Sequence, residues 1–174
     1  DNLKEEINRG MTINIGFAFL DNDITLIDVP GHEKFIKNMV AGISSIDYAL
    51  LVIAADDGIM PQTIEHFEIL KLLNIRYGSI IINKIDMVDT DWLEMVETDV
   101  KEFVKDSFLY NAPIHKISTI NNEGIQELKE YIISLKLQLK NRKKFDRGIF
   151  SLFIDRVFTS KGFGHIITGT VGSG

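Results

Sequence analysis

Apolar and polar residues alternate along this chain in a pattern that predicts strands and helices in turn. Apolar residues occupy every second position from Ile13 to Phe19, a polar turn follows at 21–23, and a second apolar run extends from Ile24 to Val29. Two extended runs joined by an Asp-Asn-Asp turn are typical of an antiparallel hairpin. We therefore expect the chain to contain a hairpin over these residues.

The middle of the chain combines short apolar runs with helical stripes. Continuous apolar runs favour strands that are covered on both faces, and apolar residues spaced three or four apart favour helices. The predicted strands lie at 48–55, 78–82 and 112–117, and the predicted helices at 33–43, 61–73, 92–103 and 125–135. This alternation indicates an α/β fold with a mostly parallel sheet and helices on both faces.

The pattern changes near residue 140, and this change divides the chain. Residues 140–148 are mostly basic and weakly apolar, as in a solvated linker, although such a run can also contact RNA phosphates. From residue 149 onward the sequence is β-rich and punctuated by glycine. We expect an α/β domain over 1–139, a linker over 140–148 and the first strands of a second domain over 149–174.

Composition excludes several classes of protein. With 45% hydrophobic and 25% charged residues, the chain of 174 residues is neither disordered nor a coiled coil. Its longest apolar run, Tyr48 to Ala55, is far shorter than the roughly 20 residues of a membrane-spanning helix. The absence of cysteine excludes disulfides and zinc–sulfur sites, and a net charge of −6 argues against a general nucleic-acid backbone binder. No secretory leader is recognisable, so we expect a cytoplasmic protein without a membrane partner.

The string Asp28-Val29-Pro30-Gly31-His32 stands at the end of the second predicted strand. Ligands of α/β sheets bind beyond the carboxyl ends of strands. A carboxylate at Asp28 suits magnesium, the backbone N–H of Gly31 suits a terminal phosphate, and His32 suits the orientation of a water. The alternative is an ordinary turn, because Asp, Pro and Gly are common in loops.

A second string, Asn83-Lys84-Ile85-Asp86, directly follows the predicted buried strand at 78–82. The Asp86 carboxylate can accept two N–H bonds from the edge of guanine, which adenine does not offer. Asn83 can brace the loop, and the aliphatic stem of Lys84 can cover the ring. A solvated polar loop explains the string equally well when it is taken alone. After the following strand, the backbone N–H groups of Ser118-Thr119 can contact the guanine oxygen.

Upstream lies Arg9-Gly10-Met11-Thr12-Ile13, where the Thr12 hydroxyl can complete magnesium coordination when a γ-phosphate is present. Without context, Thr12 is simply a β-branched strand residue.

The order and spacing of all these strings resemble the G domain of translational GTPases, with the strongest likeness to selenocysteine-specific elongation factors of the SelB type. The likeness rests on residues 9–18, 27–35, 38–42, 54–58, 61–66, 155–158, 161–164 and 168–171.

The resemblance implies a role for each matching residue. Thr12 and Asp28 would hold Mg²⁺, Gly31 would contact the γ-phosphate, and His32 would position the hydrolytic water. The guanine base would be held by five residues: Asn83, Lys84, Asp86, Ser118 and Thr119. The family binds GTP and GDP, hydrolyses GTP on the ribosome and carries an aminoacyl-tRNA, here selenocysteinyl-tRNA. Residues 149–174 would begin the β-barrel of its second domain.

The chain departs from this family at one central motif. The P-loop pattern Gly-x-x-x-x-Gly-Lys-Ser/Thr, whose backbone amides cradle phosphates, does not occur in it. We therefore expect a fragment of a P-loop-GTPase-type fold in which the first strand and the P-loop are absent. Such a fragment would bind GTP negligibly and be inactive by itself.

Other hypotheses stay open. As it stands, the chain can be a nucleotide-silent G-like domain that binds a protein or an RNA. The related GTPases of the Tu type, the gamma subunit of initiation factor two and the GTPase subunit of sulfate adenylyltransferase are alternatives for the whole protein. His66, His115 and His165 share no metal-ligand spacing, so we expect structural or solvated roles for them.

Overall fold

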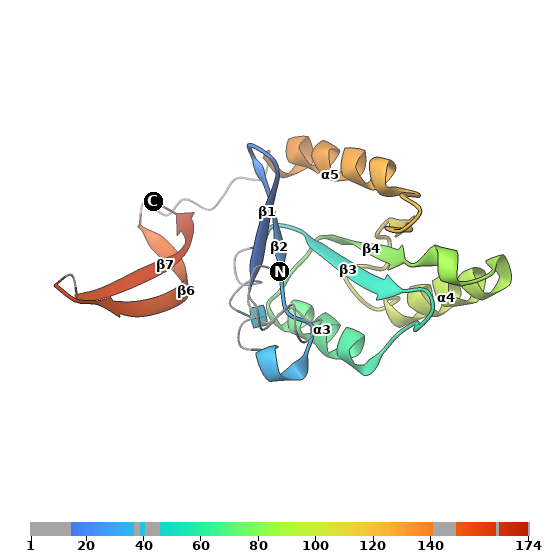
Figure 1. Ribbon diagram of the computed structural model, residues 1–174, viewed down its shortest axis with the longest axis horizontal. Helices are drawn as coiled ribbons and strands as arrows, with labels where there is room; N and C mark the ends of the chain where they lie inside the picture. The colour runs from blue at the N-terminus through green and yellow to red at the C-terminus, as the bar shows by residue number, and fades with distance from the viewer. Residues whose placement is uncertain (1–14, 37–38, 41–45, 141–148, 163, 174) are drawn as a thin grey trace. The chain divides into compact units, whose positions relative to one another are not determined.

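The computed structural model describes residues 15–36, 39–40, 46–140, 149–162 and 164–173. The chain divides into two compact units, one of residues 47–135 and the other of residues 1–46 with 136–174. The first unit holds a three-stranded parallel sheet with its helices, and the second holds two antiparallel hairpins (Figure 1). The predicted α/β class is confirmed.

The parallel sheet has the order β3-β4-β5 and is built from β3 (Ala49–Ala54), β4 (Gly78–Asn83) and β5 (Ile114–Lys116). The first two strands are rich in leucine, isoleucine and valine, which suit the centre of a covered sheet. Ala54 pairs with Asn83 and Ile82 pairs with Lys116, so the three strands end together at one edge. Polar residues follow each strand at that edge.

Helices cover both faces of this sheet. The helices α3 (Pro61–Leu72) and α4 (Thr90–Phe103) lie on one side and α5 (Ile125–Lys140) on the other (Figure 1). The face under α3 and α4 is the main apolar core. Its buried members include Leu51, Ile53, Ile80, Ile82, Phe67, Val96 and Val100.

The face under α5 carries a polar cluster instead of a purely apolar core. The Tyr48 hydroxyl lies 2.6 Å from the Ser79 hydroxyl and 2.8 Å from the Tyr131 hydroxyl. The His115 ring packs against Tyr131 with 4.5 Å between ring centroids, and its Nε2 atom is buried without a hydrogen-bond partner. Burial lowers the pKa of His115, because desolvation disfavours its charged form.

The second unit contains the predicted N-terminal hairpin, formed by β1 (Gly16–Asp21) and β2 (Ile24–Asp28). Beside its turn, Lys136 forms ion pairs with Asp21 at 3.1 Å and with Asp23 at 2.6 Å. A second antiparallel hairpin consists of β6 (Ser151–Ser160) and β7 (Gly164–Ser173), as the β-rich pattern of this region predicts.

Two predicted elements differ in extent from the structure. Within the predicted helix 33–43, residues Glu33–Phe35 form a 3₁₀ turn and residues 36, 39 and 40 are helical, whereas 37–38 and 41–43 lie outside the described residues. The strand predicted at 112–117 is limited to Ile114–Lys116, because Pro113 has no N–H to donate to a strand ladder. Residues 141–148 of the predicted linker also lie outside the described residues.

Candidate functional site

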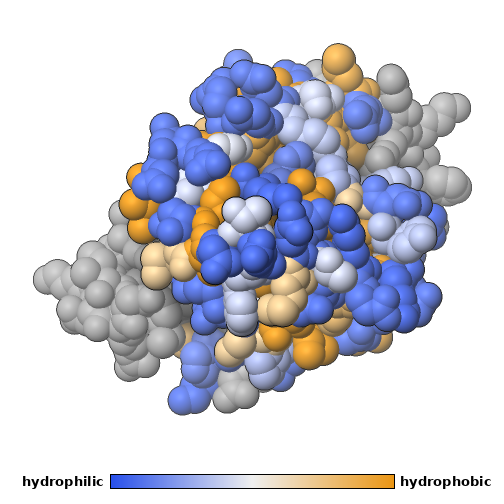
Figure 2. All heavy atoms as spheres, turned by 90° about the vertical axis from the view of Figure 1, so that its right-hand side faces the viewer, coloured by the Kyte–Doolittle hydropathy of each residue, from blue (hydrophilic) through white to orange (hydrophobic). Residues whose placement is uncertain are grey.

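The carboxyl ends of the parallel strands are joined by backbone hydrogen bonds that continue past the sheet. The Ala55 N–H donates to the Asn83 carbonyl at 2.8 Å, and the Ile117 N–H donates to the Ile82 carbonyl at 2.9 Å. A third bond runs from the Ile85 N–H to the Ile117 carbonyl at 3.3 Å. The surface toward which β3 and β4 run is mainly hydrophilic (Figure 2). The loops that carry the predicted guanine-binding residues are therefore held together by these bonds.

The Asn83–Asp86 loop turns sharply because of one unusual residue. Lys84 has φ +61° and ψ +33°, in the left-handed region that residues other than glycine seldom adopt. Its backbone N–H donates to the Asn83 side-chain oxygen at 2.7 Å, so Asn83 braces the loop as predicted from the sequence. The 3₁₀ turn Ile85–Met87 follows and presents Asp86 at the surface. Strained backbone of this kind is common at ligand sites.

Asp86 and Ser118 come together from different strand ends. The Ser118 hydroxyl donates to Asp86 Oδ1 at 2.5 Å and accepts the Asn121 N–H at 3.0 Å, while Ser118 itself is completely buried. The Asp86 carboxylate is thus held in one orientation by a charge-assisted hydrogen bond.

The backbone of Ser118 is engaged differently from our prediction. Its N–H donates to the Glu123 carbonyl at 3.0 Å within a short antiparallel bridge, so it is not available to a ligand here. Ser118 contributes through its hydroxyl instead. The exposed Thr119 remains the candidate for a backbone contact to the base.

Sequence reasoning missed the partner of Lys84. The Lys84 ammonium lies 3.1 Å from Asp56 Oδ1 and 2.9 Å from Asp56 Oδ2, with Asp57 Oδ2 at 3.7 Å. The hydrogen bond from Lys84 lowers the pKa of Asp56, and the same bond raises the pKa of Lys84. The rule that parallel strands end at one edge would have placed residues 56–57 beside residue 84.

Trp92 connects α4 to the same loops. Its indole N–H donates to the Ala55 carbonyl at 2.9 Å, and its backbone N–H is capped by the Asp89 carboxylate at 2.8 Å. The start of α4 is therefore tied to the end of β3.

The predicted phosphate-side residues lie in the other compact unit. Asp28 ends β2 and pairs with Gly16, where an added Cβ would lie 3.3 Å from the Asp28 Cβ. The absence of a side chain at Gly16 thus leaves room for the Asp28 carboxylate. Gly31 is exposed and Pro30 is buried. Thr12 lies outside the described residues.

His32 has a defined environment within that unit. The backbone N–H of Lys34 donates to His32 Nδ1 at 3.2 Å, so the neutral ring carries its proton on Nε2. The ring meets Phe35 edge-on with 6.1 Å between centroids. Both contacts restrict how the imidazole can turn.

The donors present fit a magnesium ion that is shared with a nucleotide. Among the described residues, no group of three or more histidine, aspartate or glutamate side chains is arranged to hold a metal ion. Mg²⁺ at a nucleotide site needs only one or two protein oxygens, because phosphates and water complete its octahedron. Asp28, a single carboxylate at a strand end, suits that requirement.

In the described part of the chain, no helix has the length and apolar character needed to cross a membrane.

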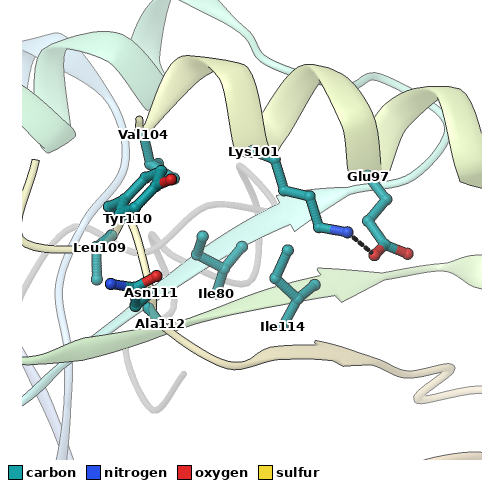
Figure 3. Close-up of a pocket in the computed structure, with 9 residues that line it drawn as sticks. All are labelled: Ile80, Glu97, Lys101, Val104, Leu109, Tyr110, Asn111, Ala112 and Ile114. Atoms are coloured by element: carbon teal, nitrogen blue, oxygen red, sulfur yellow. Dashed lines mark hydrogen bonds and ion pairs between the residues drawn. The ribbon is translucent and has the colours of Figure 1, made fainter. Parts of the chain in front are cut away.

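A pocket of about 410 Å³ lies elsewhere on the sheet unit. It is lined by residues of α4, β4, β5 and the segment before β5, with Ile80, Val104 and Ile114 among its apolar members (Figure 3). Glu97 and Lys101, which also line it, form an ion pair. None of the residues predicted from the sequence to bind a nucleotide lines this pocket.

Residues 1–137 match the family model described as the elongation factor Tu GTP binding domain. The chain belongs to this family. The resemblance to translational GTPases that we drew from the motifs is therefore confirmed.

Relatives and solved structures show which members of the family this chain resembles. The chain is 51% identical to a selenocysteine-specific elongation factor of Desulfomicrobium baculatum and 42% identical to that of Escherichia coli (strain K12), covering all of itself but 28% of each relative. It also resembles the crystal structure of a bacterial selenocysteine-specific elongation factor, EF-Sec, with a TM-score of 0.85 at 37% identity, covering 99% of itself and 30% of that chain.

A third likeness is to another solved structure. The structure of elongation factor SelB from Methanococcus maripaludis in complex with the GTP analogue GppNHp matches with a TM-score of 0.80 at 34% identity. The match covers 94% of this chain and 36% of the SelB chain. The predicted likeness to the SelB type is thus confirmed, although the chain spans less than two fifths of these proteins.

Proposed function

We propose that this chain belongs to the GTP-binding domain of a translation elongation factor that hydrolyses GTP on the ribosome while it delivers selenocysteinyl-tRNA. The observation that carries the proposal is the Ser118-oriented carboxylate of Asp86 at the end of the parallel sheet. The family to which the chain belongs and the names of its relatives agree with it. A factor with this role works in the cytoplasm.

Guanine recognition follows from the chemistry of Asp86. One of its oxygens already accepts the Ser118 hydroxyl, and the carboxylate retains lone pairs for the N1–H and the 2-amino group of guanine. Asn83 holds the turn, and the stem of Lys84 is available to cover the base. The backbone of Thr119 would contact the guanine oxygen.

Hydrolysis would use the residues that follow β2. Asp28, with Thr12, would hold Mg²⁺, which neutralises charge on the β- and γ-phosphates when it is bound. Gly31 would donate its N–H to the γ-phosphate. His32 would orient the attacking water, and the Lys34 N–H at Nδ1 supports this role because it fixes the ring. Phosphoryl transfer requires mainly such positioning and charge neutralisation.

The replacement Asp86→Asn in the full-length protein tests the guanine site. An amide at this position can donate to the 2-oxo group of xanthine, so we expect weaker GTP binding and improved binding of xanthosine triphosphate. Affinities for both nucleotides are measured by titration calorimetry with magnesium present. Asp91→Asn, an equal charge change at the exposed start of α4, serves as the control and should leave both affinities unchanged. Equal loss of both nucleotides in Asp86→Asn would refute the guanine-reading role.

The cargo requires its own experiment. The test measures how well the full-length protein protects the aminoacyl ester bond from hydrolysis. Three substrates are compared: selenocysteinyl-tRNA, the same tRNA carrying serine, and a canonical elongator aminoacyl-tRNA. We expect GTP-dependent protection of selenocysteinyl-tRNA alone. Protection of all elongator aminoacyl-tRNAs would favour a Tu-type factor, and protection of none would favour a GTPase that does not carry tRNA.

A further inference from the structure

The Lys84 ammonium is held by the carboxylate pair at the end of the neighbouring strand. Both oxygens of Asp56 lie within hydrogen-bond distance of Nζ, at 2.9 and 3.1 Å, and Asp57 Oδ2 stands further away at 3.7 Å. The Asp56 side chain is 29% exposed and the Asp57 side chain 56%. Asp56 is therefore the principal partner of Lys84.

Both ends of this ion pair are attached to a fixed backbone. Beside Asp56, the Ala55 N–H donates to the Asn83 carbonyl, and the Ala55 carbonyl accepts the Trp92 indole. At the other end, Lys84 is constrained by its left-handed backbone conformation and by the Asn83 side chain. The flexible lysine side chain must therefore run from the end of β4 to the end of β3.

An ion pair on a surface adds little to folding stability, because solvent screens it and the long side chain loses rotamer freedom. Its consequence here is geometric. A lysine side chain has many rotamers, and a ligand that uses its stem must otherwise order it during binding. A partner that orders the stem beforehand removes that cost from the binding reaction.

We propose that Asp56 is a positioning residue of the guanine site, which holds the Lys84 ammonium so that the lysine stem is ordered before the nucleotide binds. This inference rests on the proposed function, because it concerns the same loop. Asp56 does not touch the base itself but acts through Lys84. Asp57 assists at longer range.

The replacement Asp56→Asn in the full-length protein tests the inference. The amide keeps the size of the side chain but removes the charge that holds Lys84. We expect GDP, titrated calorimetrically with magnesium, to bind about three- to tenfold more weakly, since preorganisation of the stem is lost. Asp57→Asn should cause a smaller loss. Glu68→Gln, which removes the remote surface ion pair with Lys71, is the matched control and should bind GDP as the wild type does.

A double-mutant cycle separates positioning from a general structural effect. Lys84→Met keeps the apolar stem but has no ammonium for Asp56 to hold. In the Lys84→Met background, Asp56→Asn should therefore cause no further loss of GDP affinity. Equal losses in both backgrounds would overturn the inference, because Asp56 would then act independently of Lys84. Thermal unfolding of each variant checks that the fold is retained.

The same titrations distinguish this inference from the proposed function. If the wild-type protein binds GDP and Asp56→Asn binds it with the same affinity, only the proposed role of Asp56 is overturned. Wild-type protein that binds no GDP would overturn both.

Discussion

Replacement of Ser118 by alanine provides a direct test of how the candidate guanine site is built. The Ser118 hydroxyl donates to Asp86 Oδ1 at 2.5 Å and accepts the Asn121 N–H at 3.0 Å. Ser118→Ala removes both bonds but retains the Cβ atom in a completely buried position. The substitution therefore releases the Asp86 carboxylate without opening a large cavity.

The structure sets the size of the expected effect. A hydrogen bond to a charged group contributes about 1.5–3 kcal/mol. Asp86 is exposed, so water replaces part of the lost interaction and the lower end of this range applies. A loss of about 1.4 kcal/mol corresponds to tenfold weaker binding. Because this bond lies within the protein, only the part that orients Asp86 for the base enters the binding free energy, so we expect Ser118→Ala to weaken GDP binding by at most about tenfold.

The assay is calorimetric titration of the full-length protein with GDP and with inosine diphosphate, which lacks the 2-amino group. If Ser118 aims the carboxylate at that group, Ser118→Ala will also reduce the preference for GDP over inosine diphosphate. Ser134→Ala, which removes an exposed hydroxyl bonded to the Tyr131 carbonyl on α5, is the control. Wild-type affinity and preference in Ser118→Ala would refute the reasoning.

Three further predictions concern other parts of the chain. His32→Ala should leave GTP affinity nearly unchanged but reduce ribosome-stimulated hydrolysis by orders of magnitude, because water positioning acts on the transition state; wild-type turnover would exclude His32. Gly78→Ala should destabilise the fold by about 1–3 kcal/mol in urea unfolding, because its Cβ would lie 2.7 Å from the Ala49 carbonyl oxygen; an unchanged midpoint would refute this. Burial lowers the pKa of His115, so the unfolded chain binds a proton there more readily than the folded protein, and stability should fall as pH drops below about 6.5. His115→Gln should reduce that fall between pH 7 and 5 in denaturant titrations, and an identical slope would refute it.

Much of the fold was predictable because hydrophobic periodicity reports directly on burial. The strands 48–55 and 78–82 were recognised from their continuous apolar runs, and β3 and β4 occupy nearly the same residues. The helical stripe at 92–103 corresponds to α4, whose Val96 and Val100 face the core. These elements were accessible because each depends on neighbouring residues in the sequence.

The contacts that build the site were less accessible. The string 83–86 identified the loop, but no local pattern links it to the Ser118 hydroxyl or the Asp56 carboxylate, because each partner is 28 or more residues away. Such pairs depend on which strand ends lie side by side. The use of the Ser118 N–H by Glu123 also depends on a local bridge that leaves no periodic pattern.

The bond between the Trp92 indole and the Ala55 carbonyl has a practical consequence. Trp92 is the only tryptophan of the chain, and 45% of its surface is exposed. Indole emission depends on solvent and hydrogen bonding, so its intensity will report on the junction between the end of β3 and the start of α4. If the rest of the full-length protein contains no other tryptophan, Trp92 fluorescence can be followed after stopped-flow mixing with nucleotide. Loop rearrangement would then be observed in real time without an attached dye.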